Sequence, residues 1–245
     1  MDYNDFLSLV KKRRSIRRFK PDPVSDDLVD KILEAAIWAP SGFNLQPWEF
    51  VVVKDKKLKD DIVKIIRADI SYHDGMEVAR EEWQGKTLPP RYQKEKEYDD
   101  FSRAPVFILL FGDIRSNAGL PMRRRYSHDG TEQAYTSGLA SAFLHMSLAA
   151  TTLGLANQWV SAVGSPYPHC MIKELLGIPV ALEIYDMMAL GYPAYAPGPK
   201  PMREKQEMVH YDYCGVEAFR TDEQVREFIR KIRNSRAKPQ AQKID

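Results

Sequence analysis

A cluster of basic side chains with one hydroxyl lies near the start of the chain, in the segment RRSIRRF from 13 to 19. Arg13, Arg14 and Arg17 can each hold phosphate oxygens through paired hydrogen bonds, and the hydroxyl of Ser15 can donate to the same oxygens. The segment therefore indicates phosphate recognition. The alternative is a solvated run of charge, which is the role of most basic stretches.

A second polar segment follows in the sequence APSGFNLQPW, from 39 to 48. Pro40, Ser41 and Gly42 end a helix and force a turn, which leaves backbone amides and the Ser41 hydroxyl free to donate to a ligand. The side-chain amides of Asn44 and Gln46 both donate and accept, as the edge of a uracil-like ring requires. A phosphate and such a ring are the two ends of flavin mononucleotide (FMN), so the two segments together point to this cofactor.

The elements that must position these segments are predicted from the spacing of apolar residues. Helical spacing predicts helices over 5–12, 26–37, 56–67, 131–153, 168–176 and 223–232, and apolar runs predict strands over 48–53, 106–111, 155–160 and 184–190. Alternating strands and helices with no internal repeat indicate a mixed α/β or α+β sandwich.

Local signals refine this outline. Ser25 is a suitable N-cap with acidic residues after it, and Gly154 is a suitable stop for the long helix of small residues. We expect Trp48 to open a buried strand as a core residue. The stretch 113–129, with the basic run Arg123 to Arg125, is expected to be a polar loop.

Two segments stand apart from the alternating pattern. Residues 68–103 are crowded with charge and aromatic rings, so we expect a helical excursion or lid inserted into one domain that spans 1–245. Residues 192–201 are rich in Pro, Gly, Ala and Tyr, so they should run extended and begin a C-terminal arm over about 192–220.

Composition excludes several classes of protein. The 245 residues carry a formal charge of only +2, and basic and aromatic clusters do not recur along the chain, so a nucleic-acid partner is not expected. No apolar run approaches the roughly 20 residues of a membrane helix, and no signal peptide is evident, which favours a cytoplasmic location and no membrane partner. Cys170 and Cys214 form no metal or disulfide pattern, and we expect such free cysteines to be small buried hydrophobes.

Five motifs in the same order give the chain a resemblance to the nitroreductase superfamily of FMN-dependent oxidoreductases. They are RRSIR from 13, PSGFNLQPW from 40, the end of the small-residue helix at TLGL from 152, LGYP from 190, and the stretch from Lys200 to Arg203 that leads into VHY at 209. The resemblance covers nearly the whole chain. It implies a nitroreductase-like fold of the α+β class, with a central mixed sheet flanked by helices. It also implies an interlocked homodimer with a flavin in each cleft between the two subunits.

The resemblance also implies roles for individual residues. Arg13, Arg14 and Ser15 would hold the FMN phosphate and ribityl chain, and Arg17 would lie near N1 and O2 of the flavin, where a positive charge stabilises the reduced ring. The remaining cofactor-binding positions are Pro40, Ser41, Gly42 and Asn44 from the partner subunit, Trp159, Val160 and Ser161 at the pyrimidine side, and Lys200 and Arg203 toward the phosphate.

The chemistry implied is transfer of hydride from NADH or NADPH, through flavin N5, to a small aromatic or quinone-like acceptor. The sequence shows neither a catalytic carboxylate pair nor a Ser/His/Asp set, so the flavin would carry the reaction. Three alternatives stay open: a dehalogenase, an enzyme that fragments its flavin, and a flavin-binding protein with little turnover. The five histidines, His145 in the apolar helix and His169 beside Cys170 among them, receive no assigned role.

Overall fold

The computed structural model describes residues 2–79, 101–125, 127–212, 215–236 and 242–243. The chain divides into two compact units, Met1–Ala194 and Tyr195–Asp245. The expectation of one domain over 1–245 with a lid and a C-terminal arm stays a prediction, and residues 80–100 of that lid lie outside the described part of the chain.

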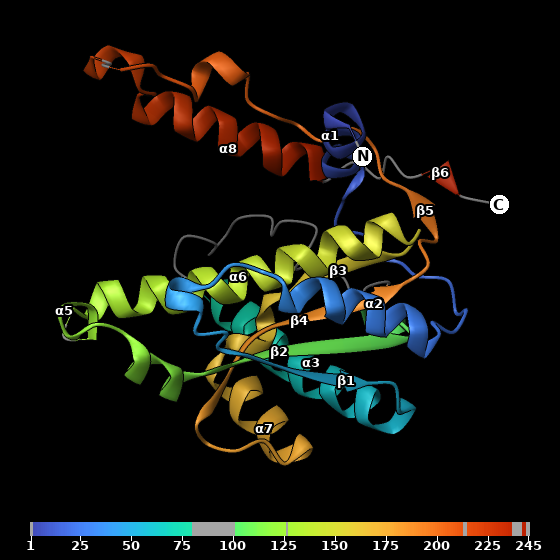
Figure 1. Ribbon diagram of the computed structural model, residues 1–245. Helices are drawn as coiled ribbons and strands as arrows, with labels where there is room; N and C mark the ends of the chain where they lie inside the picture. The colour runs from blue at the N-terminus through green and yellow to red at the C-terminus, as the bar shows by residue number, and fades with distance from the viewer. Residues whose placement is uncertain (1, 80–100, 126, 213–214, 237–241, 244–245) are drawn as a thin grey trace. The chain divides into compact units, whose positions relative to one another are not determined.

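A four-stranded sheet forms the centre of the first unit (Figure 1). Its order is β1 (Trp48–Val53), β2 (Val106–Asp113), β4 (Leu182–Gly191) and β3 (Ala156–Val160), and all three ladders are antiparallel. Ser15 forms an isolated parallel bridge with Asn157 of β3, on the side of β3 that faces away from β4. The predicted α+β class is confirmed, and the sheet is mixed only through this bridge within the described residues.

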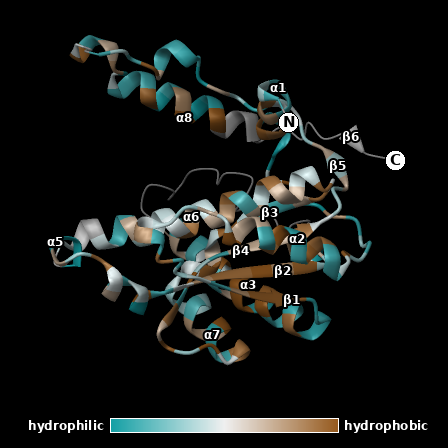
Figure 2. Ribbon diagram, viewed as in Figure 1, coloured by the Kyte–Doolittle hydropathy of each residue, from teal (hydrophilic) through white to brown (hydrophobic). Residues whose placement is uncertain are grey.

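The core lies along β2, which is hydrophobic over most of its length in Figure 2. Every side chain from Phe107 to Phe111 is fully buried, because other strands flank β2 on both sides and helices cover both faces. Burying one such side chain contributes about 1.5 to 3 kcal/mol, so β2 anchors the unit.

Helices cover both faces of the sheet (Figure 1). On one face, α2 (Asp26–Ile37) and α6 (His128–Thr152) pack on Ile108 and Leu110 of β2. On the other face lie α3 (Lys56–Val78) and α7 (Pro166–Leu176), and the Lys59 ammonium of α3 sits 5.9 Å from the ring centre of Phe107. Alternate residues of β2 therefore supply two separate cores, as the twofold periodicity of a strand dictates.

Helix ends follow the predicted capping signals. The Ser25 hydroxyl accepts from the Leu28 amide at 3.4 Å and so begins α2. After α6 the chain reverses at Gly154, whose φ of +74° is readily adopted only by glycine. The helix α1 (Tyr3–Lys12) also forms as expected, with a capping box between Asp2 and Asp5.

Four local expectations were wrong. Residues 113–129 are not a loop, because η4 (Ile114–Gly119), α5 (Met122–Arg125) and the start of α6 occupy them. Helix α3 does not end at Arg67 but runs on to Val78. Strand β1 is an edge strand whose Val52 is 36% exposed, although Trp48 is buried as predicted. Cys170 is exposed rather than buried.

Besides η4, the described part of the first unit contains three short 3-10 turns: η1 (Gly42–Asn44), η3 (Phe101–Arg103) and η5 (Ser161–Gly164). The second unit contains the strand pair β5 (Tyr195–Ala196) and β6 (Gln242–Lys243), the turns η6 (Lys205–Glu207) and η7 (Val216–Ala218), and the amphipathic helix α8 (Asp222–Arg236). The predicted helix over 223–232 is confirmed within α8. No helix in the described parts of either unit has the length and apolarity to cross a membrane.

Candidate active site

The cationic segment is fixed against the edge of the sheet. The Ile16 amide donates to the Asn157 carbonyl of β3 at 3.0 Å, and the Lys20 amide donates to the Tyr192 carbonyl at 2.8 Å. Ile16 and Phe19 are buried, at 4% and 6% exposure, so they anchor the segment from below. Because two buried apolar residues punctuate the run of charge, it is held in one path along β3 and is not a freely solvated tail.

The predicted phosphate-binding residues sit at the start of this segment. Arg13 caps the C-terminus of α1, and its amide donates to the Leu9 carbonyl at 3.0 Å. Arg13 and Arg14 are half-buried, whereas Ser15 and Arg17 are exposed. The segment therefore presents guanidinium and hydroxyl donors together, which is the donor set that a phosphate group requires.

The structure brings this segment together with the predicted pyrimidine-side residues. Ser15 pairs with Asn157, only two positions before Trp159. Ser161 is exposed where β3 gives way to η5, whereas the side chain of Val160 is 4% exposed and points into the core. Residues 13–17 and 159–161 thus form one continuous edge of the sheet. At this edge Val160 can contact a ligand only through its backbone.

A buried carboxyl group lies beneath this edge and was missed by the sequence interpretation. Asp186 of β4 is 8% exposed and accepts hydrogen bonds from the indole of Trp159 and from the Ser161 side chain. Burial raises the pKa of Asp186, and the two hydrogen bonds oppose that rise without cancelling it. Asp186 therefore ties the indole and the start of η5 to the sheet.

Packing also holds the indole of Trp159. Its ring stacks on buried Phe143 of α6, with centroids 3.9 Å apart and planes 22° apart. The signal for Asp186 was present in the sequence as one acid inside the apolar run LEIYDMMALG. A β-bulge between Leu110 and Phe111, next to Asp186 in the ladder, breaks the regular register there. Such bulges re-aim side chains at sheet positions of this kind.

The polar turn at 40–46 has an unusual backbone. Phe43, Asn44 and Gln46 have φ angles of 54°, 55° and 46°, in the left-handed region that L-residues other than Asn and Asp rarely adopt. The Ser41 hydroxyl accepts from the Gln46 amide at 3.0 Å and so closes the turn. Strained backbone of this kind costs about 1 to 3 kcal/mol for each residue and clusters at ligand sites.

Small residues of α6 let the turn approach closely. A Cβ atom added to Gly42 would lie 3.1 Å from the Ala134 Cβ, and one added to Gly138 would lie 3.1 Å from the Ser41 Cβ. Larger side chains at either glycine would push the turn away from the helix. Packing therefore supplies the free energy that holds the strained turn.

The turn and the cationic segment lie at opposite edges of the sheet. The turn leads into β1 at one edge, and residues 13–17 lie beyond β3 at the other. Four inter-strand spacings separate them, roughly 20 Å. One chain therefore brings Arg13 to Arg17 together with Trp159 to Ser161, and it does not bring Pro40 to Asn44 to the same place.

The two late basic residues belong to the second unit. Lys200 is exposed. Arg203 donates to the Glu207 carbonyl at 2.6 Å and to its carboxylate at 3.4 Å, so it is already tied within its own unit. The role of both residues toward a phosphate stays a prediction.

Two of the remaining histidines, His145 and His169, have partners within the protein. His145 of α6 is half-buried, and its ring is hydrogen-bonded to the Ala35 carbonyl of α2 at 3.0 Å. On α7, His169 pairs with Glu183 at 2.7 Å. Over the described ranges, no three His, Cys, Asp or Glu side chains gather as a metal site would require.

Comparison with known proteins decides the family. The model of the "Nitroreductase family" matches residues 10–192, which is most of the chain. The chain belongs to the nitroreductase family. The matched range of this nitroreductase-family chain includes the cationic segment, the polar turn, Trp159 to Ser161 and Asp186.

Relatives divide between two kinds of named activity. The chain is 30% identical over 198 residues to iodotyrosine deiodinase 1 of Rattus norvegicus, covering 79% of this chain and 64% of that protein. It is 27% identical over 187 residues to a putative NADH dehydrogenase/NAD(P)H nitroreductase of Archaeoglobus fulgidus, covering 76% and 84%. The chain thus spans somewhat less than two thirds of the deiodinase.

Solved structures give the same fold. A putative nitroreductase from Desulfovibrio desulfuricans, solved in complex with FMN, is 26% identical and superposes with a TM-score of 0.61. The match covers 87% of this chain and 100% of that one. The predicted nitroreductase-like fold is thereby confirmed.

Proposed function

We propose that this chain is an FMN-dependent oxidoreductase of the cytoplasm, which takes hydride from NADH or NADPH and passes it to a small aromatic or quinone-like acceptor. The observation that carries the proposal is the attachment of the cationic segment to β3, through the hydrogen bond from the Ile16 amide to the Asn157 carbonyl. It places phosphate donors beside a strand end with an exposed hydroxyl. FMN-bound relatives of this fold support the choice of cofactor.

The residues present fit FMN in their donor chemistry. Arg13, Arg14 and Ser15 offer guanidinium and hydroxyl donors to a dianionic phosphate, and Arg17 offers a fixed positive charge for the ring end. When bound, FMN would supply the redox chemistry by accepting and returning a hydride. The protein would contribute position and charge: the arginines neutralise the phosphate, and the Trp159, Ser161 and Asp186 group keeps the strand end in one arrangement.

The separation of the two predicted halves of the site supports a homodimer. Because Pro40 to Asn44 lie at the edge of the sheet opposite Arg13 to Arg17, the turn would serve the flavin of a partner chain. Its strained backbone would then present the backbone amides of Ser41 and Gly42 and the side-chain amide of Asn44 across the interface, because the backbone amide of Asn44 already donates to the Ser41 carbonyl at 3.0 Å. Lys200 and Arg203, in the second unit, would reach toward the phosphate.

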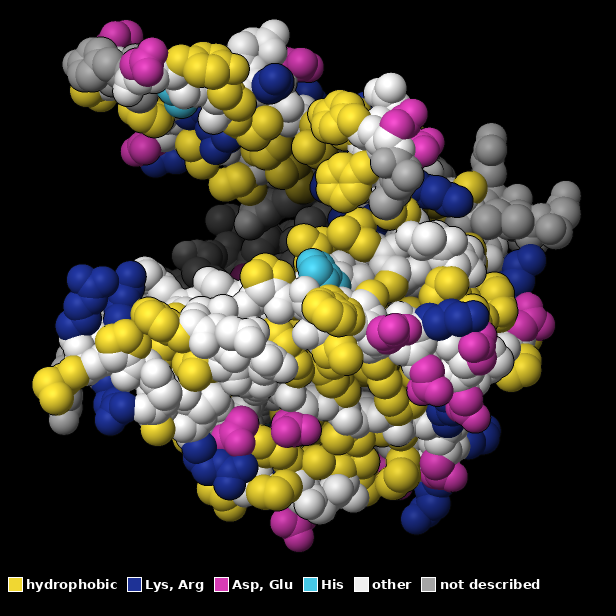
Figure 3. Space-filling model, in the orientation of Figure 1, with side chains coloured by type: hydrophobic (Ala, Val, Ile, Leu, Met, Phe, Trp, Pro, Cys, Tyr) yellow, Lys and Arg dark blue, Asp and Glu magenta, His cyan; other side chains and the backbone are white. Residues whose placement is uncertain are grey.

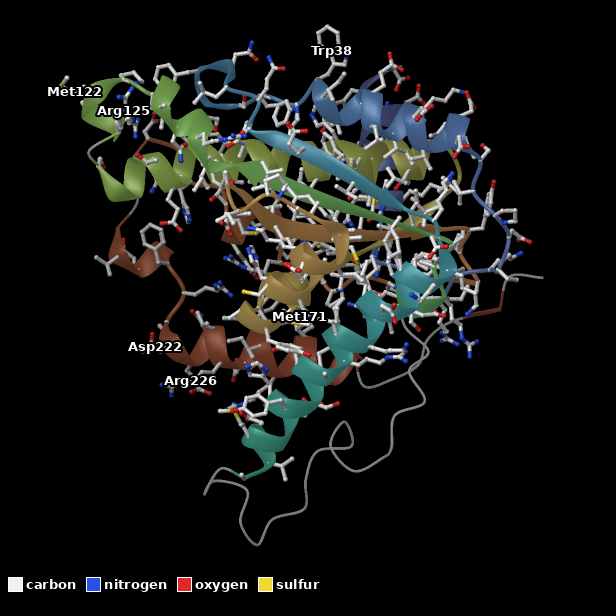
Figure 4. All side chains as sticks on the ribbon, turned by 90° about the horizontal axis from the view of Figure 1, so that it is seen from below. Trp38, Met122, Arg125, Met171, Asp222 and Arg226 are labelled. Atoms are coloured by element: carbon white, nitrogen blue, oxygen red, sulfur yellow. The ribbon has the colours of Figure 1, made fainter. Side chains whose placement is uncertain are left out.

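The surface of the first unit supports a second copy. Helix α1 has no buried residue, and its Tyr3, Phe6 and Val10 are 72%, 46% and 40% exposed along one helical face. Leu144 on the outer face of α6 is 46% exposed, and Trp38 at the end of α2 is 79% exposed and stands clear of the ribbon in Figure 4. Hydrophobic side chains gather over α2 and α6 in Figure 3. Exposed apolar side chains that gather on one surface support a protein interface there.

A dehalogenase is the second candidate, and the deiodinase relatives favour it. Of the lid residues that could grip a zwitterionic substrate, Tyr72 and Glu77 lie on α3, whereas Tyr92 and Lys94 lie outside the described residues. The sequence also leaves open a flavin-fragmenting enzyme and a flavin-binding protein with little turnover. No described contact favours either of them.

Rapid mixing of the FMN-loaded protein with NADH or NADPH tests the proposal. We expect the flavin absorbance to bleach within seconds and to return when a nitroaromatic or a quinone is added. Return of colour with a halogenated tyrosine alone would assign the chain to the dehalogenases. A flavin that stays oxidised with both nicotinamides would overturn the proposal.

A further inference from the structure

Three consecutive arginines, Arg123, Arg124 and Arg125, end the short helix α5 and have no role in the site described so far. All three side chains are exposed, and Figure 3 shows basic side chains gathered around this helix. In the part of the chain that the structure describes, no carboxylate pairs with Arg123 or Arg124. Because most basic runs are merely solvated, the position of this arginine run decides what it can bind.

Arg125 holds the arginine run against the preceding turn η4. Its guanidinium donates to the Ala118 carbonyl and, at 3.4 Å, to the Leu120 carbonyl. The Arg124 carbonyl accepts from the Thr131 hydroxyl at 2.6 Å, which ties α5 to the start of α6. Polar contacts on both sides therefore fix the backbone of the run on the surface of the first unit.

The arginine run lies beside the strained turn at 41–46. Gly119 follows Ala118 and approaches the turn so closely that an added Cβ would lie 2.6 Å from the Leu45 Cδ2. The Arg125 guanidinium, bonded to the Ala118 carbonyl, is thus held one residue away from this contact. One continuous surface of the first unit therefore carries both the turn and the arginine run.

NADPH and NADH differ only in the phosphate on the 2′-oxygen of the adenosine ribose. Such a phosphate monoester carries close to two negative charges at neutral pH and offers three acceptor oxygens. Guanidinium groups match these oxygens with paired donors, and an arginine near the ribose is a recurrent means of accommodating the 2′-phosphate. Arg123 and Arg124 together supply the charge and the donors for this group.

The adenosine end of either nicotinamide must lie away from the flavin. Hydride transfer requires the nicotinamide ring to stack on the flavin, so the rest of the molecule extends over the surrounding surface. The proposed function assigns the turn at 41–46 to the flavin of a partner chain. Because the arginine run adjoins that turn, it lies on the surface that the adenosine end would cross.

An exposed apolar side chain accompanies the arginines. Met122 directly precedes them and is 75% exposed, as its label at the end of α5 in Figure 4 lets the reader see. A flexible thioether makes favourable contacts with aromatic rings, and the plane of a guanidinium group stacks on such rings. Methionine beside arginine therefore suits an adenine ring that carries a phosphate on its ribose.

We propose that Arg123 and Arg124 bind the 2′-phosphate of NADPH, so that the protein takes hydride from NADPH in preference to NADH. Met122 contacts the adenine ring, and Arg125 is a positioning residue that holds the run beside the turn. The inference rests on the proposed function and names the reductant that its site selects.

A binding experiment tests the 2′-phosphate contact without any hydride transfer. Oxidised, FMN-loaded protein is titrated calorimetrically with 2′,5′-ADP and with 5′-AMP, which contain the adenosine end and no nicotinamide. We expect 2′,5′-ADP to bind about tenfold more tightly, the lower end of the range for charge-assisted hydrogen bonds because the arginines are exposed. Arg123→Gln and Arg124→Gln should each weaken 2′,5′-ADP roughly threefold and leave 5′-AMP unchanged.

Two further variants separate the specific contact from other effects. Lys57→Gln removes an exposed positive charge at the start of α3, on the other face of the sheet, and should change neither affinity. Met122→Gln should weaken both nucleotides by the same factor, because both carry adenine. All of these side chains are exposed, so their replacement should not unfold the protein.

Rapid mixing with the two nicotinamides tests the consequence for the reaction. At low nicotinamide concentration, the rate constant for flavin reduction should be about tenfold higher with NADPH than with NADH. Replacing both Arg123 and Arg124 with glutamine should remove this preference by lowering the NADPH value alone. A structural role of the arginines would lower both values together.

The outcomes separate this inference from the proposed function. Equal affinity of the original protein for the two nucleotides, or equal loss of both in the arginine variants, would overturn the inference even if NADH reduces the flavin. Selective loss of 2′,5′-ADP would support the 2′-phosphate site even if neither nicotinamide reduces the flavin, a result that would overturn the proposed source of hydride.

Discussion

Arg13 is the residue whose predicted role is most directly measurable. It is half-buried at the end of α1, at the start of the segment that is hydrogen-bonded to β3. Replacing it with alanine should remove one or more charge-assisted hydrogen bonds, each worth about 1.5 to 3 kcal/mol, and weaken FMN binding roughly ten- to more than a hundredfold. Fluorescence titration of FMN into apoprotein measures this.

Arg17 provides the matched comparison for Arg13. If it faces the flavin ring, Arg17→Ala should lower the reduction potential of bound FMN and weaken binding less than Arg13→Ala does. If both variants lose the same affinity for FMN while the reduction potential of the flavin stays unchanged, the result would contradict distinct roles for Arg13 and Arg17. It would leave only a general attraction of FMN by positive charge.

Asp186 leads to a prediction about pH. Burial raises its pKa above the ordinary value of 3.8, so the folded protein binds a proton at this site more tightly than the unfolded chain does. The free energy of unfolding should therefore fall as the pH rises from about 4 through the raised pKa. In Asp186→Asn this fall should be missing, because the amide stays neutral while it still accepts from Trp159.

Urea unfolding of the two proteins across this pH range tests the argument. The stability of Asp186→Asn relative to the original protein should increase with rising pH. If the free energies of unfolding of the two proteins change in parallel with pH, the pKa of Asp186 is not raised in the folded protein.

The elements show why some of the fold could be predicted from the sequence. Helix α2 and the end of α6 were found because Ser25 and Gly154 act locally, through a side-chain cap and a positive φ. The short helices between 114 and 125 were missed because they bury little and so leave no apolar period. The extension of α3 to Val78 was missed because Gly75 and its polar neighbours resemble a break.

The candidate site likewise contains residues that could be predicted from the sequence and residues that could not. The donor residues at 13–17 and 40–44 were visible by type and spacing. The place of Asp186 in the site depends on which strands become neighbours, which the register of β4 against β2 and β3 decides.

Two glycines test how tightly the elements pack. A Cβ added to Gly112 of β2 would lie 2.0 Å from the Tyr135 hydroxyl and 2.7 Å from Leu139, so Gly112→Ala should lower the free energy of unfolding by about 1 to 3 kcal/mol. Gly75 of α3 has nothing within 4 Å, so Gly75→Ala is the control and should raise it by up to about 1 kcal/mol. Losses of equal size in both variants would contradict the described packing.

For the whole molecule, the proposed function implies that a partner chain completes each flavin site, because the two predicted half-sites lie at opposite edges of the sheet. Leu144→Arg places a charge on the outer face of α6, where the side chain is 46% exposed and its loss costs the single chain little. We expect this variant to sediment as a monomer and to lose FMN. Val180→Arg, at an 87% exposed position, is the control and should stay dimeric. A dimeric Leu144→Arg protein would place the interface elsewhere.

A mixed dimer tests the shared site most directly. One chain carries Arg13→Ala, and the other carries Asn44→Gly, which removes the amide but tolerates the φ of 55°. Each homodimer should bind FMN weakly at both sites. In the mixed dimer, purified through two different tags, one site has both defects and the other has neither, so titration should show one tight FMN site per dimer. Two weak sites in the mixed dimer would contradict a flavin site built from two chains.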